Sequence, residues 1–114
     1  MNQTFDFGFG PVPAHRHPNG GGWVADSAFV AETAYVGRNA VVYGKARVSG
    51  NAVVTGNARV SGNAVVTDDA VVTGNARVTG WARVFEDAKV SGNAVVTGNA
   101  SLYSNAQVTS GHHT

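Results

Sequence analysis

The chain lacks most of the residues on which cross-linking and catalysis depend. None of its 114 residues is cysteine, which excludes disulfide bonds and thiolate chemistry. Only 13% of the residues are charged and the formal net charge is +1, so the composition gives no electrostatic reason to expect nucleic acid or an acidic membrane as a partner. Histidine is absent from the whole stretch between His17 and His112.

Long apolar runs are absent as well. No apolar stretch is long enough to cross a bilayer, so the sequence predicts no membrane-spanning segment. The start of the chain lacks the basic region and the following apolar run of a Sec-type signal peptide. We therefore expect one soluble domain, cytoplasmic by default, or else exported by another route or carried on a particle.

What the chain has instead is a repeat of six residues. From Ala28 to Val108 an alanine recurs every six residues, and a valine, or once Leu102, stands two places after each alanine. Fourteen such hexads follow one another without an insertion. Self-similarity at a short fixed period indicates a repeat architecture, in which each unit buries its apolar side by stacking on its neighbours.

The hexads predict short strands joined by tight corners. Alanine and valine are two residues apart, so both point to the same side of an extended strand. A Gly-Asn pair commonly follows, as at residues 50–51 and 74–75, and both residue types tolerate the positive φ of a corner. Three strands and three corners close one coil. The sequence thus predicts an all-β, single-domain parallel β-helix (β-solenoid) with three hexads, hence about 18 residues, per coil, in about 4.5–5 coils.

The repeat resembles that of the bacterial hexapeptide-repeat proteins. Their pattern is an aliphatic residue, three variable positions, a small residue and one more variable position, and residues 36–41, Val-Gly-Arg-Asn-Ala-Val, match its common form. The resemblance covers about three quarters of the chain, and it implies a left-handed helix of triangular cross-section. In most later hexads the glycine lies one place further on, as in Val-Ser-Gly-Asn-Ala at residues 48–52.

The resemblance brings two kinds of enzyme into consideration. Acyltransferases of the family use a histidine base in a cleft between coils of neighbouring subunits, usually in a trimer, and related carbonic anhydrases place three histidines on one zinc ion. Neither residue set can be assigned here, because no histidine lies within the hexads and no loop interrupts them to form a pocket. We predict no catalytic and no cofactor-binding residue, and an acyltransferase-like protein stays an alternative.

The sequence outside the hexads divides into two parts. Residues 1–22 hold three prolines and three consecutive glycines, which predict an extended and loop segment without regular structure. We expect this segment to cap the first coil. Residues 23–110 form the solenoid and residues 111–114 a tail. The expected capping side chains are Phe5, Phe7 and Phe9.

Stacking of one coil on the next sorts the corner residues into columns. One column of asparagines predicts a ladder of side-chain hydrogen bonds along the stacked coils: Asn39, Asn57, Asn75 and Asn93. A second column is acidic, with carboxylates one coil apart that repel each other unless they are neutralised. This column predicts a calcium site, or alternatively solvated carboxylates partly neutralised by Arg47 and Arg83. Its members are Asp68, Asp69, Glu86 and Asp87.

The four histidines lie near the two ends of the chain. Imidazoles are common zinc ligands, and head-to-tail stacking of molecules would bring the two pairs together. This arrangement predicts a zinc site shared between molecules, formed by His15, His17, His112 and His113. The alternative is that all four are solvated, and apart from these two cation sites we expect no cofactor.

Apolar side chains at outward positions predict contacts between copies of the chain, because such patches usually mark protein interfaces. They are Val53, Val71, Val41, Val95, Tyr43, Trp81, Phe85 and Tyr103. A last strand over residues 107–110 would also leave a bare parallel edge. We therefore predict a non-catalytic structural protein whose partner is itself, joined side by side or end to end into fibres. Outward threonine columns leave an ice- or glycan-binding surface as a second alternative.

Overall fold

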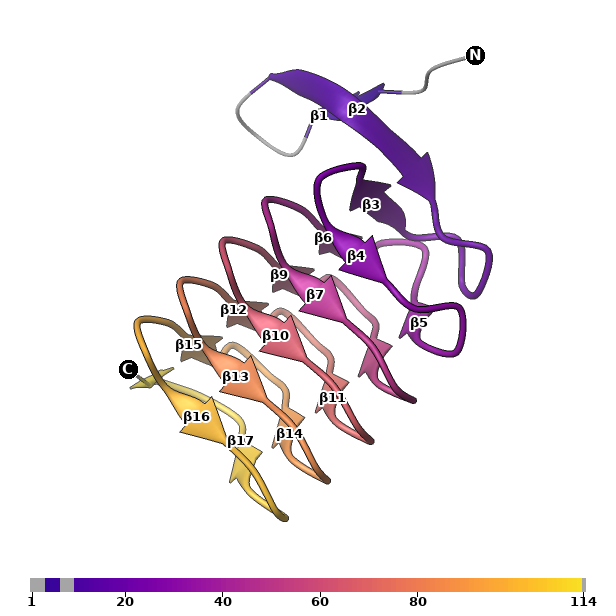
Figure 1. Cartoon of the computed structure of the whole chain (residues 1–114). Coiled ribbons are helices and arrows are strands. Elements are labelled where there is room, and N and C mark those ends of the chain that lie inside the picture. The colour runs from indigo at the N-terminus through magenta and orange to yellow at the C-terminus, as the bar shows by residue number, and fades with distance from the viewer. Residues whose placement is uncertain (1–3, 7–9, 114) are drawn as a thin grey trace.

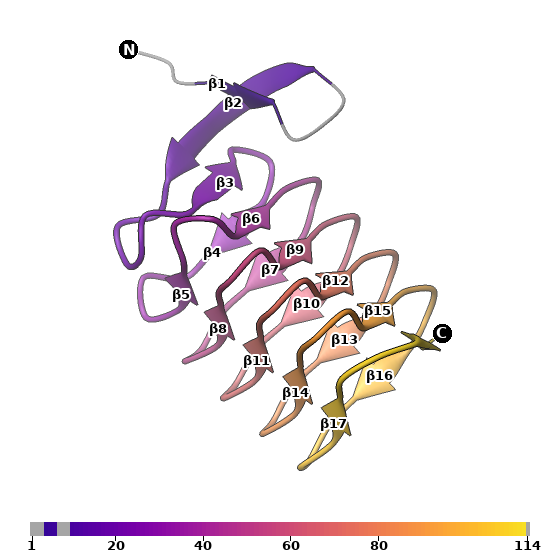
Figure 2. The same ribbon diagram turned by 180° about the vertical axis from the view of Figure 1, so that it is seen from behind.

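The structure is a computed structural model that describes residues 4–6 and 10–113, and these residues form strands and turns without a helix. Among them, therefore, no helix is long and apolar enough to cross a membrane. The chain winds into coils, each with three short strands, and the coils stack into three sheets that enclose the core (Figures 1 and 2).

Two of the sheets have five strands each. The β10 sheet has the order β16 (Ser101–Leu102), β13 (Arg83–Val84), β10 (Val65–Val66), β7 (Arg47–Val48) and β4 (Phe29–Val30). The β11 sheet has the order β17 (Gln107–Val108), β14 (Lys89–Val90), β11 (Val71–Val72), β8 (Val53–Val54) and β5 (Tyr35–Val36).

The third sheet, the β12 sheet, has eight strands because the N-terminal segment adds to it. Its order is β1 (Thr4–Asp6), β2 (Pro11–Arg16), β3 (Trp23–Ala25), β6 (Val41–Val42), β9 (Arg59–Val60), β12 (Arg77–Val78), β15 (Val95–Val96) and β18 (His112–His113).

From β3 to β17 the strands of the solenoid pair in parallel with a constant offset, whereas β18 pairs with β15 one residue short of it, Val95 with His112. Val65 pairs with Arg83 and Val66 with Val84, so each residue pairs with the one three hexads further along the chain. Amides of outward strand residues donate to the next coil, as from the Val65 amide to the Ala82 carbonyl at 3.0 Å, whereas amides of the hexad alanines donate within their own coil, as from Ala64 to the Ser61 carbonyl at 3.2 Å. The predicted coil of three hexads, each with one strand, is confirmed, as is the all-β solenoid of about five coils. The left hand stays a prediction from the resemblance.

The alanines and valines of the hexads fill the inside, as predicted. Every one of them from Ala34 to Val96 is fully buried. The hydrophobic effect thus acts on one continuous column of small side chains. Alanine matters because it keeps each coil thin enough for three sheets to meet.

Glycine at the corners has a clear steric reason. Gly74 has a φ of 67°, in the left-handed region that L-residues with a Cβ avoid. A Cβ added there would lie 2.8 Å from the amide nitrogen of Gly92 in the next coil. The corners of successive coils therefore stack backbone on backbone.

The N-terminal segment is more regular than the prolines predicted, and that prediction was wrong. β2 includes Pro11 and Pro13 and pairs antiparallel with both β1 and β3. The prolines are tolerated because their positions pair only with β1, whereas β3 pairs with residues 14–16. The Pro13 carbonyl still accepts the Asp26 amide, at 2.9 Å.

This hairpin lies over the N-terminal end of the solenoid (Figure 1). The Phe5 ring stacks on Trp23, with 4.9 Å between ring centroids, while Phe7 and Phe9 lie outside the described residues. At the other end, the pairing continues past Ser110, because β18 pairs in parallel with β15. The repeat pattern alone did not predict that strand.

We expect Ala64→Leu to destabilise the fold, because the Ala64 side chain is fully buried between stacked coils and overpacking of a filled core costs about 1–3 kcal/mol. The matched control is Val53→Leu at a half-buried outward position. Thermal unfolding should show a melting temperature lower by roughly 5–15 °C for Ala64→Leu and little change for the control. Equal melting temperatures would contradict the inward placement of the alanines.

Candidate functional site

Charge is strongly segregated on this solenoid. Among the outward strand positions of residues 29–109 none is acidic, whereas several are cationic: Arg47, Arg59, Arg77, Arg83 and Lys89. Five of the seven acidic residues lie instead on one edge, at the corners between the β10 and β11 sheets, which we call the acidic edge: Glu32, Asp68, Asp69, Glu86 and Asp87. A net charge of +1 thus hides a large separation of charge.

Two residues of the acidic edge have an unusual backbone conformation and accept hydrogen bonds from backbone amides. Asp68 and Glu86 occupy corner positions that are glycine elsewhere, with φ of 60° and 58°. The Glu86 amide donates to Asp68 Oδ2 at 3.1 Å, and the Ser104 amide donates to Glu86 Oε1 at 3.0 Å. Each carboxylate thus binds an amide of the next coil, which offsets the cost of the left-handed conformation.

The predicted calcium site gains no support from this geometry. Within residues 4–6 and 10–113, no group of three or more histidine or acidic side chains is arranged to hold a metal ion. The alternative, solvated carboxylates partly neutralised by Arg47 and Arg83, stays a prediction, although neither arginine forms a direct ion pair within the described part of the chain. All four carboxylate residues are exposed, and none forms an ion pair with another of the described residues.

The outer face of the β12 sheet carries an arginine pair. Arg59 and Arg77 are paired residues on adjacent strands, and both are exposed. Val41 and Val95 flank the pair on the neighbouring strands. Like charges directly opposite each other destabilise a sheet, and neither arginine has an ion-pair partner in the described residues.

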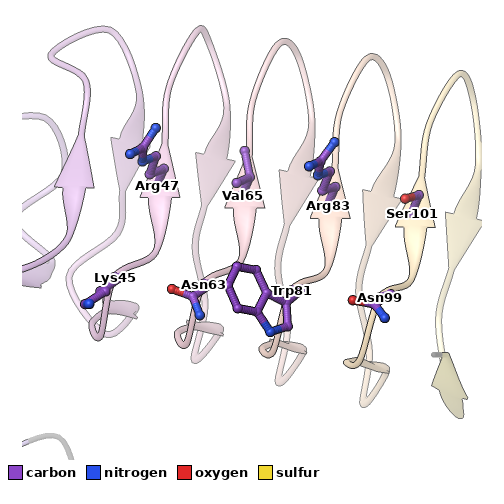
Figure 3. Close-up of a pocket in the computed structure, with 8 residues that line it drawn as sticks. All are labelled: Lys45, Arg47, Asn63, Val65, Trp81, Arg83, Asn99 and Ser101. Carbon is purple, nitrogen blue, oxygen red and sulfur yellow. The ribbon is translucent and has the colours of Figure 1, made fainter.

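A groove runs along the edge between the β12 and β10 sheets (Figure 3). Corner residues line one side of it, and outward residues of the β10 sheet line the other: Lys45, Asn63, Trp81 and Asn99 opposite Arg47, Val65, Arg83 and Ser101. We call it the Trp81 groove. Its volume is about 480 Å³, within the range of small-molecule sites, and no acidic residue lines it.

The edge between the β11 and β12 sheets carries the asparagine ladder. Asn57 Nδ2 donates to Asn75 Oδ1 at 3.2 Å, and Asn75 Nδ2 donates to Asn93 Oδ1 at 3.3 Å. The described contacts do not extend the ladder to Asn39. The asparagine side chains of this edge thus hydrogen-bond to one another, whereas those of the Trp81 groove have no such bonds among the described residues.

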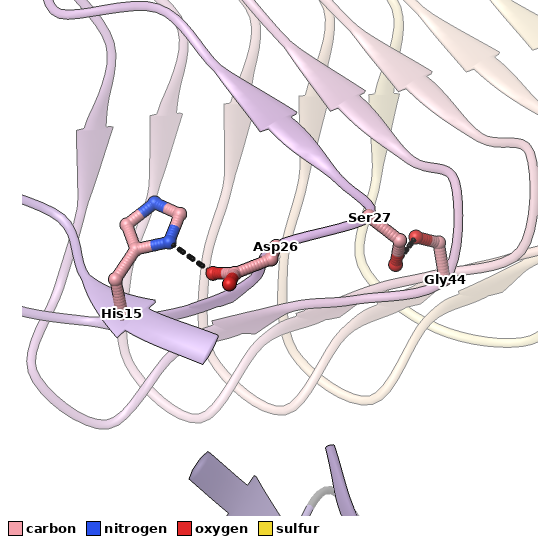
Figure 4. A network of polar contacts seen from close by, with 4 residues as sticks. All are labelled: His15, Asp26, Ser27 and Gly44. Atoms are coloured by element: carbon pink, nitrogen blue, oxygen red, sulfur yellow. Dashed lines mark hydrogen bonds and ion pairs between the residues drawn. The ribbon is translucent and has the colours of Figure 1, made fainter. Parts of the chain in front are cut away.

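The two N-terminal histidines have different surroundings. His15 Nδ1 donates to Asp26 Oδ1 at 2.8 Å on the surface (Figure 4). His17 is buried, and its Nε2 donates to the Ala34 carbonyl at 2.7 Å. The His17 side chain therefore joins the N-terminal segment to the corner at Ala34 in the first coil. The alternative that all four histidines are solvated was wrong for this residue.

The other two histidines lie at the opposite end of the solenoid. His112 and His113 form β18, and His113 Nε2 donates to the Ser110 carbonyl at 3.0 Å. One copy of the chain thus keeps the two pairs apart (Figure 1). A zinc site shared between molecules stays a prediction.

The predicted contact residues do not form one surface. Val53 and Val71 are neighbours on the β11 sheet. Val41 and Val95 flank the arginine pair, and both Val41 and Tyr43 pack against the buried residues under the N-terminal hairpin. Phe85 and Tyr103 stack on the β10 sheet with 5.5 Å between centroids. Trp81 stands alone at a corner and is 64% exposed.

Sequence reasoning missed the Trp81 groove and the burial of His17. The signal for the groove was available, because Lys45, Asn63, Trp81 and Asn99 follow one another at intervals of one coil. The signal for His17 was not, because its partner Ala34 lies across an irregular loop.

Parallel sheets, a constant offset of three hexads and an alanine–valine core define the class: the chain is a β-helix repeat protein. Three segments, residues 46–60, 58–74 and 88–104, match the family model described as the YdcK beta solenoid repeat. No curated protein and no solved structure matched the chain. The resemblance to hexapeptide acyltransferases is not confirmed by these comparisons.

We expect Gly74→Asp to be tolerated better than Gly74→Ala. Both substitutions place a Cβ in the left-handed region at a cost of about 1–2 kcal/mol. Only the carboxylate can accept the amide of Gly92, as Asp68 accepts that of Glu86, which should restore roughly half of the loss. Urea unfolding of the two variants measures the difference. An aspartate variant that is the less stable of the two would contradict this account of the acidic edge.

Proposed function

We propose that the chain is a non-catalytic structural β-solenoid that self-associates side by side, with the acidic edge of one copy bound to the Arg59–Arg77 pair of the next. The observation that carries this proposal is the segregation of charge. Acidic side chains are concentrated at one edge of the triangle, and the sheet opposite exposes two arginines that form no ion pair with any described residue.

The spacing of the charges supports this pairing. Asp69 and Asp87 lie one coil apart, as their separation of three hexads requires, and Arg59 and Arg77 lie on adjacent strands. Both intervals equal one strand spacing, about 4.8 Å. Two parallel solenoids can therefore match carboxylate to guanidinium in register, a geometry that favours bidentate ion pairs.

The triangular cross-section gives the association its direction. The acidic edge joins the β10 and β11 sheets, so it is the corner opposite the β12 sheet (Figure 2). Copies in the same orientation therefore line up corner to face. Such a heterologous contact does not close on itself and produces open rows.

Apolar contact adds to the charge pairing. Val41 and Val95 flank the arginines on the same face, and both are half-buried. Burial of these side chains against a neighbour removes apolar surface from water. The association also relieves the repulsion between the two arginines, so it should weaken when salt screens the charges.

We expect the purified chain to form assemblies larger than a dimer at low ionic strength and to dissociate as salt is raised to roughly 0.5 M, where screening reaches only a few ångströms. Sedimentation velocity at several salt and protein concentrations measures this. Arg59→Gln with Arg77→Gln should abolish assembly, and Arg47→Gln with Arg83→Gln, a matched pair on another face, should leave it intact.

A charge exchange tests the pairing itself. Neither a variant with Arg59→Glu and Arg77→Glu nor one with Asp69→Lys and Asp87→Lys should assemble alone, and an equimolar mixture should form open rows in which the two variants alternate. Asp69 and Asp87 suit this test because, unlike Asp68 and Glu86, they have no positive φ. A monomer at every salt concentration, or equal loss of assembly in both arginine-to-glutamine pairs, would refute the proposal.

A further inference from the structure

The Trp81 groove has the composition of a ligand site that the proposed association leaves unused. It lies along the edge between the β12 and β10 sheets, away from the acidic edge. The Trp81 ring is turned toward Asn63, and the Arg47 and Arg83 side chains point the same way on either side of Val65 (Figure 3). Ring, amides and cations therefore line one open groove.

The two tryptophans differ in what packs on their rings. The Trp23 ring is stacked by Phe5 at 4.9 Å and lies under the Arg16 guanidinium at 4.8 Å, so it serves the fold. Trp81 is 64% exposed, and no aromatic or cationic side chain of the described residues packs on its ring. An exposed indole face of this kind is available for stacking.

The charge in the groove is of one sign. Lys45, Arg47 and Arg83 all line it, with no carboxylate among the lining residues, and none of the three forms an ion pair in the described part of the chain. Arg47 and Arg83 are separated by the strand of Val65, hence by two strand spacings, roughly 10 Å. Anionic groups spaced along an extended ligand suit this arrangement.

Neutral polar groups complete the set. Asn63 and Asn99 lie one coil before and one coil after Trp81 in the same corner column. An amide side chain both donates and accepts hydrogen bonds, as adjacent hydroxyl groups do. Neither asparagine side chain has a hydrogen-bond partner among the described residues, in contrast to the asparagine ladder.

We propose that the Trp81 groove binds an acidic oligosaccharide, a chain of pyranose units that bear carboxylate groups. The apolar face of one pyranose stacks on Trp81, its hydroxyls bind the flanking asparagines, and carboxylates on neighbouring units bind Arg47 and Arg83. Single-stranded nucleic acid fits less well, because its sites stack successive bases on several aromatic rings, and this groove has one.

Isothermal titration with an oligogalacturonate hexamer tests the proposal. The protein carries Asp69→Asn and Asp87→Asn, which remove the contact proposed for self-association and leave the groove unchanged, so the two proposals can fail separately. We expect saturable binding that weakens at least about tenfold in Trp81→Ala and about tenfold in Arg47→Gln with Arg83→Gln. The matched controls, Trp23→Phe and Arg59→Gln with Arg77→Gln, should bind as before.

Three further probes separate the contributions. A neutral galactose oligomer should bind at least tenfold more weakly, and polyglutamate, which has charge without sugar rings, should bind without loss in Trp81→Ala. Absence of oligogalacturonate binding, or affinity unchanged by Trp81→Ala, would overturn the proposal. Tighter binding of an oligothymidylate than of the hexamer would also overturn it, in favour of nucleic acid.

Discussion

The structure depends on hydrogen bonding between coils at a constant interval of three hexads. Outward strand residues donate to the coil that follows, as the Val65 amide does to the Ala82 carbonyl, and the corners stack by the same interval. A residue inserted or deleted within a strand would turn the later side chains of that strand to the wrong side. The unbroken run of hexads and the buried alanines are consequences of this single constraint.

Because the backbone repeats, the chemistry of the surface is arranged in columns. The same corner position holds glycine at residue 50, aspartate at 68 and glutamate at 86, and each acid binds an amide of the following coil. Glycine supplies the conformation alone, whereas the acids also supply charge at a cost in backbone strain. At the acidic edge the chain therefore places carboxylates at positions of positive φ, where glycine would adopt the backbone conformation without strain.

The sequence predicts the fold better than the site, and the reason is physical. Alanine and valine two residues apart determine the strands, and the interval of three hexads predicts both the asparagine ladder and the acidic edge. The same interval also places Asn63 and Trp81 in one corner column. Their position beside Arg47 and Arg83 could not be predicted in this way, because these arginines lie on strands and only the angle between two sheets brings strand and corner residues together. The burial of His17 and the strand over Pro11–Arg16 depend on irregular segments that no period describes.

Segregated charge allows the two proposed contacts to operate together. The acidic edge and the Trp81 groove are different corners of the triangle, so a neighbour bound to the β12 face need not enter the groove. A row of copies joined corner to face would then present one groove per copy at a regular interval. An extended acidic polysaccharide spanning several grooves would bind with an avidity far above that of one site, because each further contact becomes intramolecular. Self-association would in this way convert a weak, shallow groove into a strong binding surface.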